Sequence, residues 1–390
     1  MTPQLRFPEF TDKWQVKKLG SFSKTFSGGT PTSTNPSFYN GNIPFIKSGE
    51  IAKNKTSQNI SEEALKKSSA KMVESGDILY ALYGATSGQV AISQMNGAIN
   101  QAILCIRPDA NRYFIYSKLA ADKNTILETY LQGGQGNLSA DIIKKLAIAT
   151  PSKPEQEKIA DFLTAVDERI SVSEKKLELL ETYKRGVMQK IFSQQVRFKE
   201  ENGKPYPEWM EKAVSEFLKE RKEYTSKGGD LEHISLTTVG VVPKSERYER
   251  DFLVGSTDKQ YRITRLDDIC YNPANLKFGV IARNKYKDGI FSPIYVTYVV
   301  TNADIGFVEY LVTSRDFIQR ARKYEQGTVY ERMAVSPQDI AKLKVRMPVV
   351  DEQQKIATFL TALDEKITAE KSKLTATHKF KKALLQRMFV

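Results

Sequence analysis

Two segments of the chain, residues 151–195 and 348–390, carry apolar side chains at helical spacing. In each segment the apolar positions recur at multiples of seven residues in two rows, a pattern that is typical of helices in a coiled coil. The rows are Ile159, Val166, Leu180, Val187 and Leu163, Ile170, Leu177, Ile191 in the first segment, and Ile356, Leu363, Leu384 and Leu360, Ile367, Leu374, Met388 in the second. Each segment opens with proline or acidic residues and has no later proline, so each is predicted to form one long helix.

The two predicted helices are expected to pack against each other. Because residues 196–347 lie between them, the simplest topology is an antiparallel pair within one chain, and a helix of this length spans roughly 57 Å. Such a pair would act as a rigid spacer with a folded module at each end. A coiled coil that joins two separate chains is the alternative. Polar residues interrupt the rows at equivalent places, Ser173 and Glu370 in one row and Lys184 and Lys381 in the other. The residues predicted to make the helix-pair and subunit contacts are Ile159, Phe162, Leu163, Val166, Ile170, Leu177, Leu180, Ile356, Phe359, Leu360, Leu363, Ile367, Leu374 and Leu384.

The segments outside these helices have short apolar runs bounded by Gly, Asn or Pro, which are typical of strands. The strand-like runs are Ile43–Ile46, Asp77–Tyr83, Gly88–Ile92 and Ala102–Ile106 in the first module, and Leu236–Val242, Asp268–Tyr271, Gly279–Arg283 and Ile294–Val300 in the second. A helix is expected near Tyr113–Tyr130 and another near Ile305–Tyr324. The predicted fold class is therefore mixed α/β, with two compact α+β modules separated by two long antiparallel helices.

The chain contains an internal duplication. Residues 154–170 align without gaps to residues 351–367, with 12 of 17 positions identical. The modules between these anchors share only scattered residues, which indicates two copies of one fold that recognise different targets. Neutral divergence of redundant surface is the alternative. The predicted boundaries are 1–150 for the first module, 151–195 for the central helix, 196–347 for the second module and 348–390 for the C-terminal helix.

Composition and charge favour a polyanionic partner. Lys and Arg number 59 against 46 acidic residues, a net charge of +13, and most of the excess lies in the modules, with +6 in residues 1–150 and +4 in residues 196–347. Such a balance fits nucleic acid, although many bacterial proteins are somewhat basic. No apolar run is long enough for a membrane helix and the N-terminus lacks a secretory pattern, so a cytoplasmic protein is expected. Two cysteines and two histidines in the whole chain give no basis for a disulfide framework or a metal site.

Loops of both modules mix small polar, aromatic and basic residues, which can hydrogen-bond phosphates and base edges. Taken singly, each such loop is better explained by a turn or a solvated surface. The residues selected as candidate DNA contacts are Thr30, Ser33, Thr34, Lys47, Ser48, Tyr83, Thr86, Ser87, Gln101, Gln135 and Asn137 in the first module, and Thr237, Thr238, Lys244, Asn272, Asn275, Lys277, Arg283, Tyr324, Gln326, Tyr330 and Arg332 in the second.

Motifs for catalysis are absent from the sequence. There is no Gly-x-x-x-x-Gly-Lys-Ser/Thr phosphate loop, and the string from Asn272 to Asn275 is not the Asn-Pro-Pro-aromatic motif of an amino-methyltransferase. The Glu-x-Lys triplets at Glu174 and Glu220 follow no Pro-Asp of nuclease type, and two histidines give little support for a nucleophile–base pair. A non-catalytic chain is predicted. A single-chain enzyme with unrecognised catalytic motifs, or a coiled-coil scaffold without a DNA role, remains as an alternative.

The chain resembles the specificity subunits of type I restriction-modification systems over essentially its full length. The resemblance rests on a repeated signature, with supporting similarity in the segment from Phe7 to Trp14 and around Ile43-Pro44-Phe45. The signature residues are Pro151, Glu155, Gln156, Ile159, Ala160 and Leu163, and again Pro348, Glu352, Gln353, Ile356, Ala357 and Leu360.

The resemblance implies how such a chain would work. Each module would be a target recognition domain that reads one half of a bipartite, asymmetric site in double-stranded DNA, and the helices would fix the unread gap. Two modification subunits would bring S-adenosylmethionine and flip an adenine in each half-site. Restriction subunits, with ATP and Mg²⁺, would join them. The chain itself would bind no cofactor.

Overall fold

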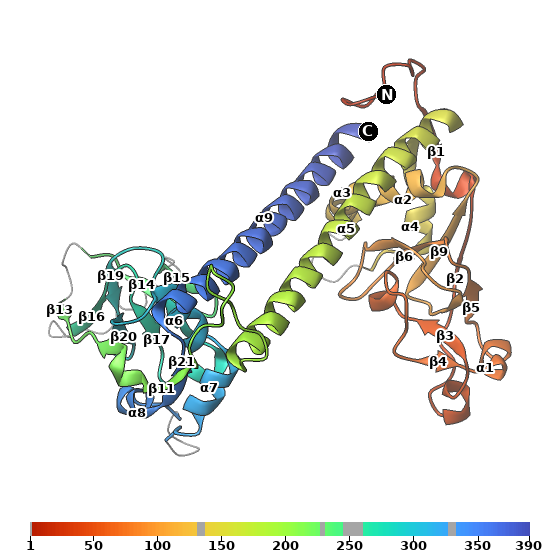
Figure 1. Ribbon diagram of the computed structural model, residues 1–390. Helices are drawn as coiled ribbons and strands as arrows, with labels where there is room; N and C mark the ends of the chain where they lie inside the picture. Colours follow the sequence, from red (N-terminus) through yellow and green to blue (C-terminus); the bar gives the residue numbers. More distant parts are fainter. Residues whose placement is uncertain (1, 131–136, 227–230, 245–259, 327–332) are drawn as a thin grey trace. The chain divides into compact units, whose positions relative to one another are not determined.

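The computed structural model describes residues 2–130, 137–226, 231–244, 260–326 and 333–390 (Figure 1). The chain divides into two units, Met1–Lys176 with Lys371–Val390, and Leu177–Glu370. Each unit therefore contains one module together with part of both long helices. Among the described helices, none combines the length and the apolar character needed to cross a membrane.

The first unit is built on two four-stranded sheets. One has the order β2-β9-β6-β7, with β2 at Ser23–Ser27, β9 at Ile103–Pro108, β6 at Ile78–Ala81 and β7 at Val90–Ile92, all antiparallel. The other has the order β4-β3-β8-β5, with β4 at Asn59–Ile60, β3 at Ile43–Ile46, β8 at Gly97–Ile99 and β5 at Lys71–Val73. Within the second sheet β3 and β8 run parallel, so that Phe45 lies beside Ala98 and Ile46 beside Ile99.

The strand β6 is central to this unit because all four of its side chains are buried. Ile78 and Tyr80 face a core that includes Phe114 and Leu119 of α2 (Arg112–Ala121), while Leu79 and Ala81 face a second core with Ile46 and Ile99. A strand buried on both faces explains the continuous apolar run from Ile78 to Leu82. The helices α1 (Glu62–Lys66), α3 (Lys123–Tyr130) and α4 (Ala140–Lys145) and the paired strands β1 (Gln15–Lys18) and β10 (Ala147–Thr150) complete the module.

The second unit repeats the main sheet of the first. Its order is β12-β20-β17-β18, with β12 at Leu218–Glu220, β20 at Val296–Val300, β17 at Ile269–Tyr271 and β18 at Ile281–Arg283. The pair β11 (Met210–Ala213) and β21 (Lys344–Met347) matches β1 and β10. Two copies of one fold, as predicted from the duplication, therefore persist although most of the sequence has diverged.

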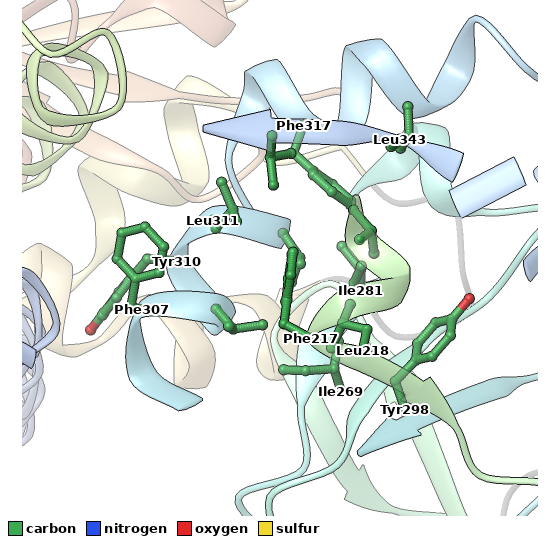
Figure 2. Packing of buried hydrophobic residues seen from close by; sticks show 14 of the residues in the cluster. Phe217, Leu218, Ile269, Ile281, Tyr298, Phe307, Tyr310, Leu311, Phe317 and Leu343 are labelled. Atoms are coloured by element: carbon green, nitrogen blue, oxygen red, sulfur yellow. The ribbon is translucent and has the colours of Figure 1, made fainter. Parts of the chain in front are cut away.

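The remaining strands of the second unit form two smaller sheets. They are β13 (Tyr224–Ser226), β16 (Gln260–Thr264) and β19 (Gly289–Phe291) in one, and β14 (Ile234–Thr237) and β15 (Gly240–Pro243) in the other. Figure 2 shows the main core of this unit, which includes Phe217 just before β12, Ile269 of β17 and Phe317 of α7 (Arg315–Arg322). The helices α6 (Ile305–Val312) and α8 (Pro337–Lys342) cover the same core.

Several predicted elements have different bounds. The run Leu236–Val242 is predicted as one strand but forms a hairpin of β14 and β15, in which Thr238 and Val239 make the turn and Gly240, at φ +119°, begins β15. The single helix expected near Ile305–Tyr324 is two helices, since Ser314 caps the N-terminus of α7 through the backbone N–H of Phe317. The helix expected near Tyr113–Tyr130 is likewise divided into α2 and α3.

The long helices are α5 (Lys153–Phe192) and α9 (Val350–Met388), close to the predicted bounds. They are antiparallel within each unit. In the first unit Lys381 pairs with Asp167 and His378 lies 3.6 Å from Glu174, so the residue number rises along one helix as it falls along the other. In the second unit Lys184 pairs with Asp364. The predicted antiparallel helix pair is confirmed, whereas the distance between the two modules stays a prediction.

The heptad rows supply the buried faces of both helices. Buried positions are Ile159, Leu163, Val166, Ile170, Leu384 and Met388 in the first unit, and Ile191, Ile356, Leu360, Leu363 and Ile367 in the second. Phe162, Phe359, Leu374, Leu177 and Leu180 are half-buried. The rows thus pack against their own module as well as against the partner helix.

Candidate nucleic-acid interface

The signature glutamate of each half fixes the start of a long helix to its module. Glu155 is 1% exposed and accepts hydrogen bonds from Arg6 Nε at 2.7 Å, Arg6 Nη2 at 2.8 Å and Trp14 Nε1 at 3.2 Å. Such a bidentate pair satisfies a buried carboxylate that would otherwise be costly to desolvate. We call Arg6, Trp14, Glu155 and Gln156 the first joint.

The second half repeats this arrangement. Glu352 is fully buried and accepts from Arg197 Nη2 at 2.9 Å, Arg197 Nε at 3.3 Å and Trp209 Nε1 at 3.1 Å. We call Arg197, Trp209, Glu352 and Gln353 the second joint. Arg197 and Trp209 therefore have the same structural role in the second half as Arg6 and Trp14 have in the first.

The signature glutamines link each long helix to a helix of its own module, which is α2 in the first unit and α6 in the second. Gln156 accepts from the backbone N–H of Asn111 at 3.0 Å and donates to the Pro151 carbonyl at 2.9 Å. Asn111 in turn caps the N-terminus of α2. Gln353 makes the same two bonds, with the N–H of Asp304 at 2.9 Å and the Pro348 carbonyl at 2.8 Å, and Asp304 caps α6.

A Tyr–Asp–Lys cluster explains why lysines interrupt the heptad rows. In the first unit Tyr113 donates to Asp167, which also pairs with Lys381 at 2.5 Å. In the second, Tyr310 donates to Asp364 at 2.8 Å, and Lys184 Nζ lies 2.5 Å from the same carboxylate. Burial, followed by the neighbouring carboxylate, raises the pKa of Tyr113, and burial also raises that of Tyr310, so both phenols stay protonated and donate.

Some predicted contact residues of the first module lie together. Thr30, Ser33 and Lys47 line one pocket of about 490 Å³, and the Thr30 hydroxyl donates to the carboxamide oxygen of Gln101 at 2.6 Å. Thr34 is exposed beside Thr32, and Ser48 begins the short 3-10 turn Ser48–Glu50.

The other predicted residues of the first module belong to different loops. Tyr83, Thr86 and Ser87 form the connection from β6 to β7, where the Ser87 hydroxyl donates to the Leu82 carbonyl at 3.0 Å. Burial raises the pKa of Tyr83. Asn137 is exposed, and Gln135 lies outside the described residues.

In the second module several predicted side chains are engaged within the protein. Asn272 is 4% exposed and its side-chain oxygen accepts from the backbone N–H groups of Ala274 and Asn275, so it shapes the turn after β17. Arg283 contacts Asp267 at 2.6 Å. Thr237 bonds the Gly240 carbonyl at 3.0 Å in the β14–β15 hairpin, which also includes the exposed Thr238.

Lys277 draws attention to a residue that the sequence analysis missed. Its Nζ lies 5.2 Å from the ring centre of Phe278, a side chain that is 66% exposed at the turn between β17 and β18. Tyr324 and Gln326 are exposed after α7 and Lys244 is half-buried, whereas Tyr330 and Arg332 lie outside the described residues. An exposed phenylalanine beside a lysine is a suitable group for stacking on a base, and exposure of a large apolar side chain was not visible from the sequence pattern.

A family model described as the type I restriction modification DNA specificity domain matches residues 11–182 and 301–377. The chain belongs to this family. The specificity subunit of the type I restriction enzyme MjaIX of Methanocaldococcus jannaschii is 29% identical over 182 residues, which make up 43% of this chain and 41% of that protein. The putative MjaX specificity subunit of the same organism is 24% identical over 355 residues, 80% of this chain and 76% of that protein.

A solved structure of the family shares the fold. The S subunit of a type I restriction-modification system from M. genitalium has a TM-score of 0.62 at 16% sequence identity, covering 100% of this chain and 99% of that one. The alignment with the MjaIX subunit spans less than half of that protein. The predicted resemblance is confirmed for the family and for the fold.

The family match of this type I specificity chain covers nearly the whole first module and, in the second half, only the part from α6 onward. The matched ranges include Trp14, Glu155 and Asp167 in one half, and Glu352 and Asp364 in the other. Residues 183–300, which hold Phe278 and Arg283, lie outside the match. The match therefore includes the joint glutamates of both halves, whereas most strands and loops of the second module lie outside it.

Proposed function

We propose that the chain is the DNA sequence-recognition subunit of a type I restriction-modification complex, in which each module reads one half of a bipartite, asymmetric site. The observation that carries the proposal is the repeated joint in a member of this family. Glu155 and Glu352 hold two modules of one sheet order in the same way, while the loops on those modules differ. Two modules of the same fold with different loops suit a DNA site with two unlike halves.

The charge distribution supports double-stranded DNA as the ligand. Both modules carry a net positive charge, which locates the duplex by releasing counterions from phosphates, and loop Gln, Asn, Thr and Lys side chains then distinguish base edges. The chain itself is not catalytic under this proposal. It works in the cytoplasm, where the DNA substrate of such a complex lies.

The partner subunits follow from the same proposal. Two modification subunits dock on the helix pair, one beside each joint, and bring S-adenosylmethionine to an adenine in each half-site. Restriction subunits supply ATP-driven movement and Mg²⁺-dependent cleavage. Repetition of the joint supports two copies of one partner, because an equivalent surface occurs in each half of the chain.

The helices α5 and α9 set the number of unread base pairs between the two halves of the site. Antiparallel pairing supports this role, because Asp167–Lys381 and Lys184–Asp364 fix the register of the pair at two equivalent points. A fixed register gives a fixed spacing.

Exchange of one module tests the proposal. The full chain is co-expressed with its modification subunit, and methylated adenines are mapped across the host genome. Replacing residues 15–145 with the corresponding module of another family member is expected to change one half of the methylated site and to leave the other half unaltered. A chimera that folds, assembles and methylates the original sequence would contradict modular reading.

A further inference from the structure

The first module contains a pocket that is lined by polar, charged and apolar side chains. Its volume is about 490 Å³, within the roughly 300–1,000 Å³ typical of sites for small groups. Its polar side chains are Thr30, Ser33, Asn40, Lys47, Gln58 and Asn100. Half of this set was selected from the sequence as DNA contacts, whereas the three amides were not.

One sheet positions the pocket's floor. Lys47 and Asn100 each directly follow one of the two parallel strands, β3 and β8, so both side chains lie at the same edge of the sheet. Gln58 precedes β4, and its carbonyl accepts from the N–H of Phe45 in β3 at 2.9 Å. Residues far apart in the sequence are thus held on one rigid support.

A pair of glycines brings the pocket's wall against this edge. A Cβ atom on Gly28 would lie 1.8 Å from the Ile99 carbonyl oxygen, and the N–H of Gly29 donates to that oxygen at 3.2 Å. Only glycine allows so close an approach. The contact fixes Thr30, the next residue, at the pocket rim.

The pocket offers hydrogen-bond donors and a positive charge. Among the described residues, Lys47 Nζ and the side-chain amides of Asn40 and Gln58 have no protein partner, and Asn100 uses its oxygen for the N–H of Ala102 at 3.1 Å, which leaves its amino group available. None of the lining residues is acidic. Glu50, close to Lys47 in sequence, directs its carboxylate to the backbone N–H groups of Lys47 and Ser57.

We infer that this pocket receives one nucleotide of the target DNA, with Lys47 at its phosphate and Asn40 and Gln58 at its base edge. A nucleotide presents both a negative charge and clustered acceptors, and carboxamides can bond a base through two atoms at once. This inference rests on the proposed function and deepens it, because it assigns specificity-determining residues within one half-site reader.

Three single substitutions separate base reading from phosphate contact. The full chain is purified with its modification subunit as Asn40→Ala, Gln58→Ala, Lys47→Met and the control Gln94→Ala, an exposed amide of the same module outside the pocket. Asn40→Ala and Gln58→Ala are expected to lower discrimination at one position of one half-site by roughly 5- to 150-fold. Lys47→Met is expected to weaken binding to all sequences and to reduce the slope of log affinity against log salt by about one.

The readouts are genome-wide methylation maps and binding to duplexes that differ at single positions, with thermal unfolding to show that each variant is folded. Methylated sequences and affinities that match the Gln94→Ala control in both amide variants would overturn base reading by the pocket. An unchanged salt slope in Lys47→Met would overturn the phosphate contact. If wild-type complex methylates no two-part site at all, the proposed function itself fails, which is a different result.

Discussion

Replacing Glu155 with alanine removes the centre of the first joint. The carboxylate is almost fully buried, and its loss leaves the Arg6 guanidinium, which is 13% exposed, without its two charged hydrogen bonds and the Trp14 N–H without an acceptor. Breaking a buried ion pair by removing one partner costs roughly 3–5 kcal/mol. For a unit of this size each kcal/mol lowers the Tm by roughly 2–4 °C, so the expected decrease is about 6–20 °C.

Thermal and urea unfolding of the purified full chain measure this effect. Glu157→Ala is a matched control, because Glu157 belongs to the same turn of α5 but is exposed, and its loss is expected to change stability by less than about 0.5 kcal/mol. Arg6→Ala in the Glu155→Ala background is expected to cost much less than Arg6→Ala alone, since the pair is already broken. A Glu155→Ala variant as stable as Glu157→Ala would show that the first joint does not stabilise the fold as expected.

Three further predictions concern the acid range, the Tyr–Asp–Lys clusters and the helix pair. Burial alone would raise the pKa of Asp77, but hydrogen bonds from Arg107 and the Glu74 backbone outweigh it and hold that pKa below its ordinary value. A lowered folded-state pKa gives stability above about pH 4 that is lost as the pH falls through it, so urea titrations should show the advantage of wild type over Asp77→Asn shrinking below about pH 4. Tyr113→Phe and Tyr310→Phe should each lower the free energy of unfolding by roughly 1.5–3 kcal/mol in urea melts. If one of the two substitutions left the free energy of unfolding unchanged, the two clusters would not be equivalent. Four residues added to equivalent stretches of both long helices lengthen the pair by about 6 Å, so methylation mapping should show a gap about two base pairs longer, and an unchanged gap would contradict the spacing role.

The long helices could be predicted from the sequence because heptad spacing is a local and repeated signal. The register between the two helices could not be predicted in the same way. Lys184 and Lys381 looked like defects in the apolar rows, and their role became clear only when Asp364 and Asp167 were found opposite them. The signature Glu155 was recognised as a family feature, but its partner Arg6 lies 149 residues away, and no local pattern connects the two.

The candidate interface was harder to predict, because its residues are assembled by strand pairing. Asn40, Gln58 and Asn100 come together through the parallel pair β3–β8 and the neighbouring strand β4, and short strands of this kind carry no periodic signal that identifies their partners. Asn272 shows the opposite error. It lies in a polar loop and could hydrogen-bond a base, yet its side-chain oxygen accepts hydrogen bonds from backbone N–H groups of its own turn.

The contact of Gly28 and Gly29 with the end of β8 also bears on how new sequence preferences could arise. Any side chain at Gly28 would collide with a backbone carbonyl that cannot move without disturbing the strand, whereas Ser33 and Asn40 border open space. Libraries that vary the rim and hold both glycines constant should therefore retain folded members with altered targets. Random change at the glycine pair would mostly yield chains that no longer fold.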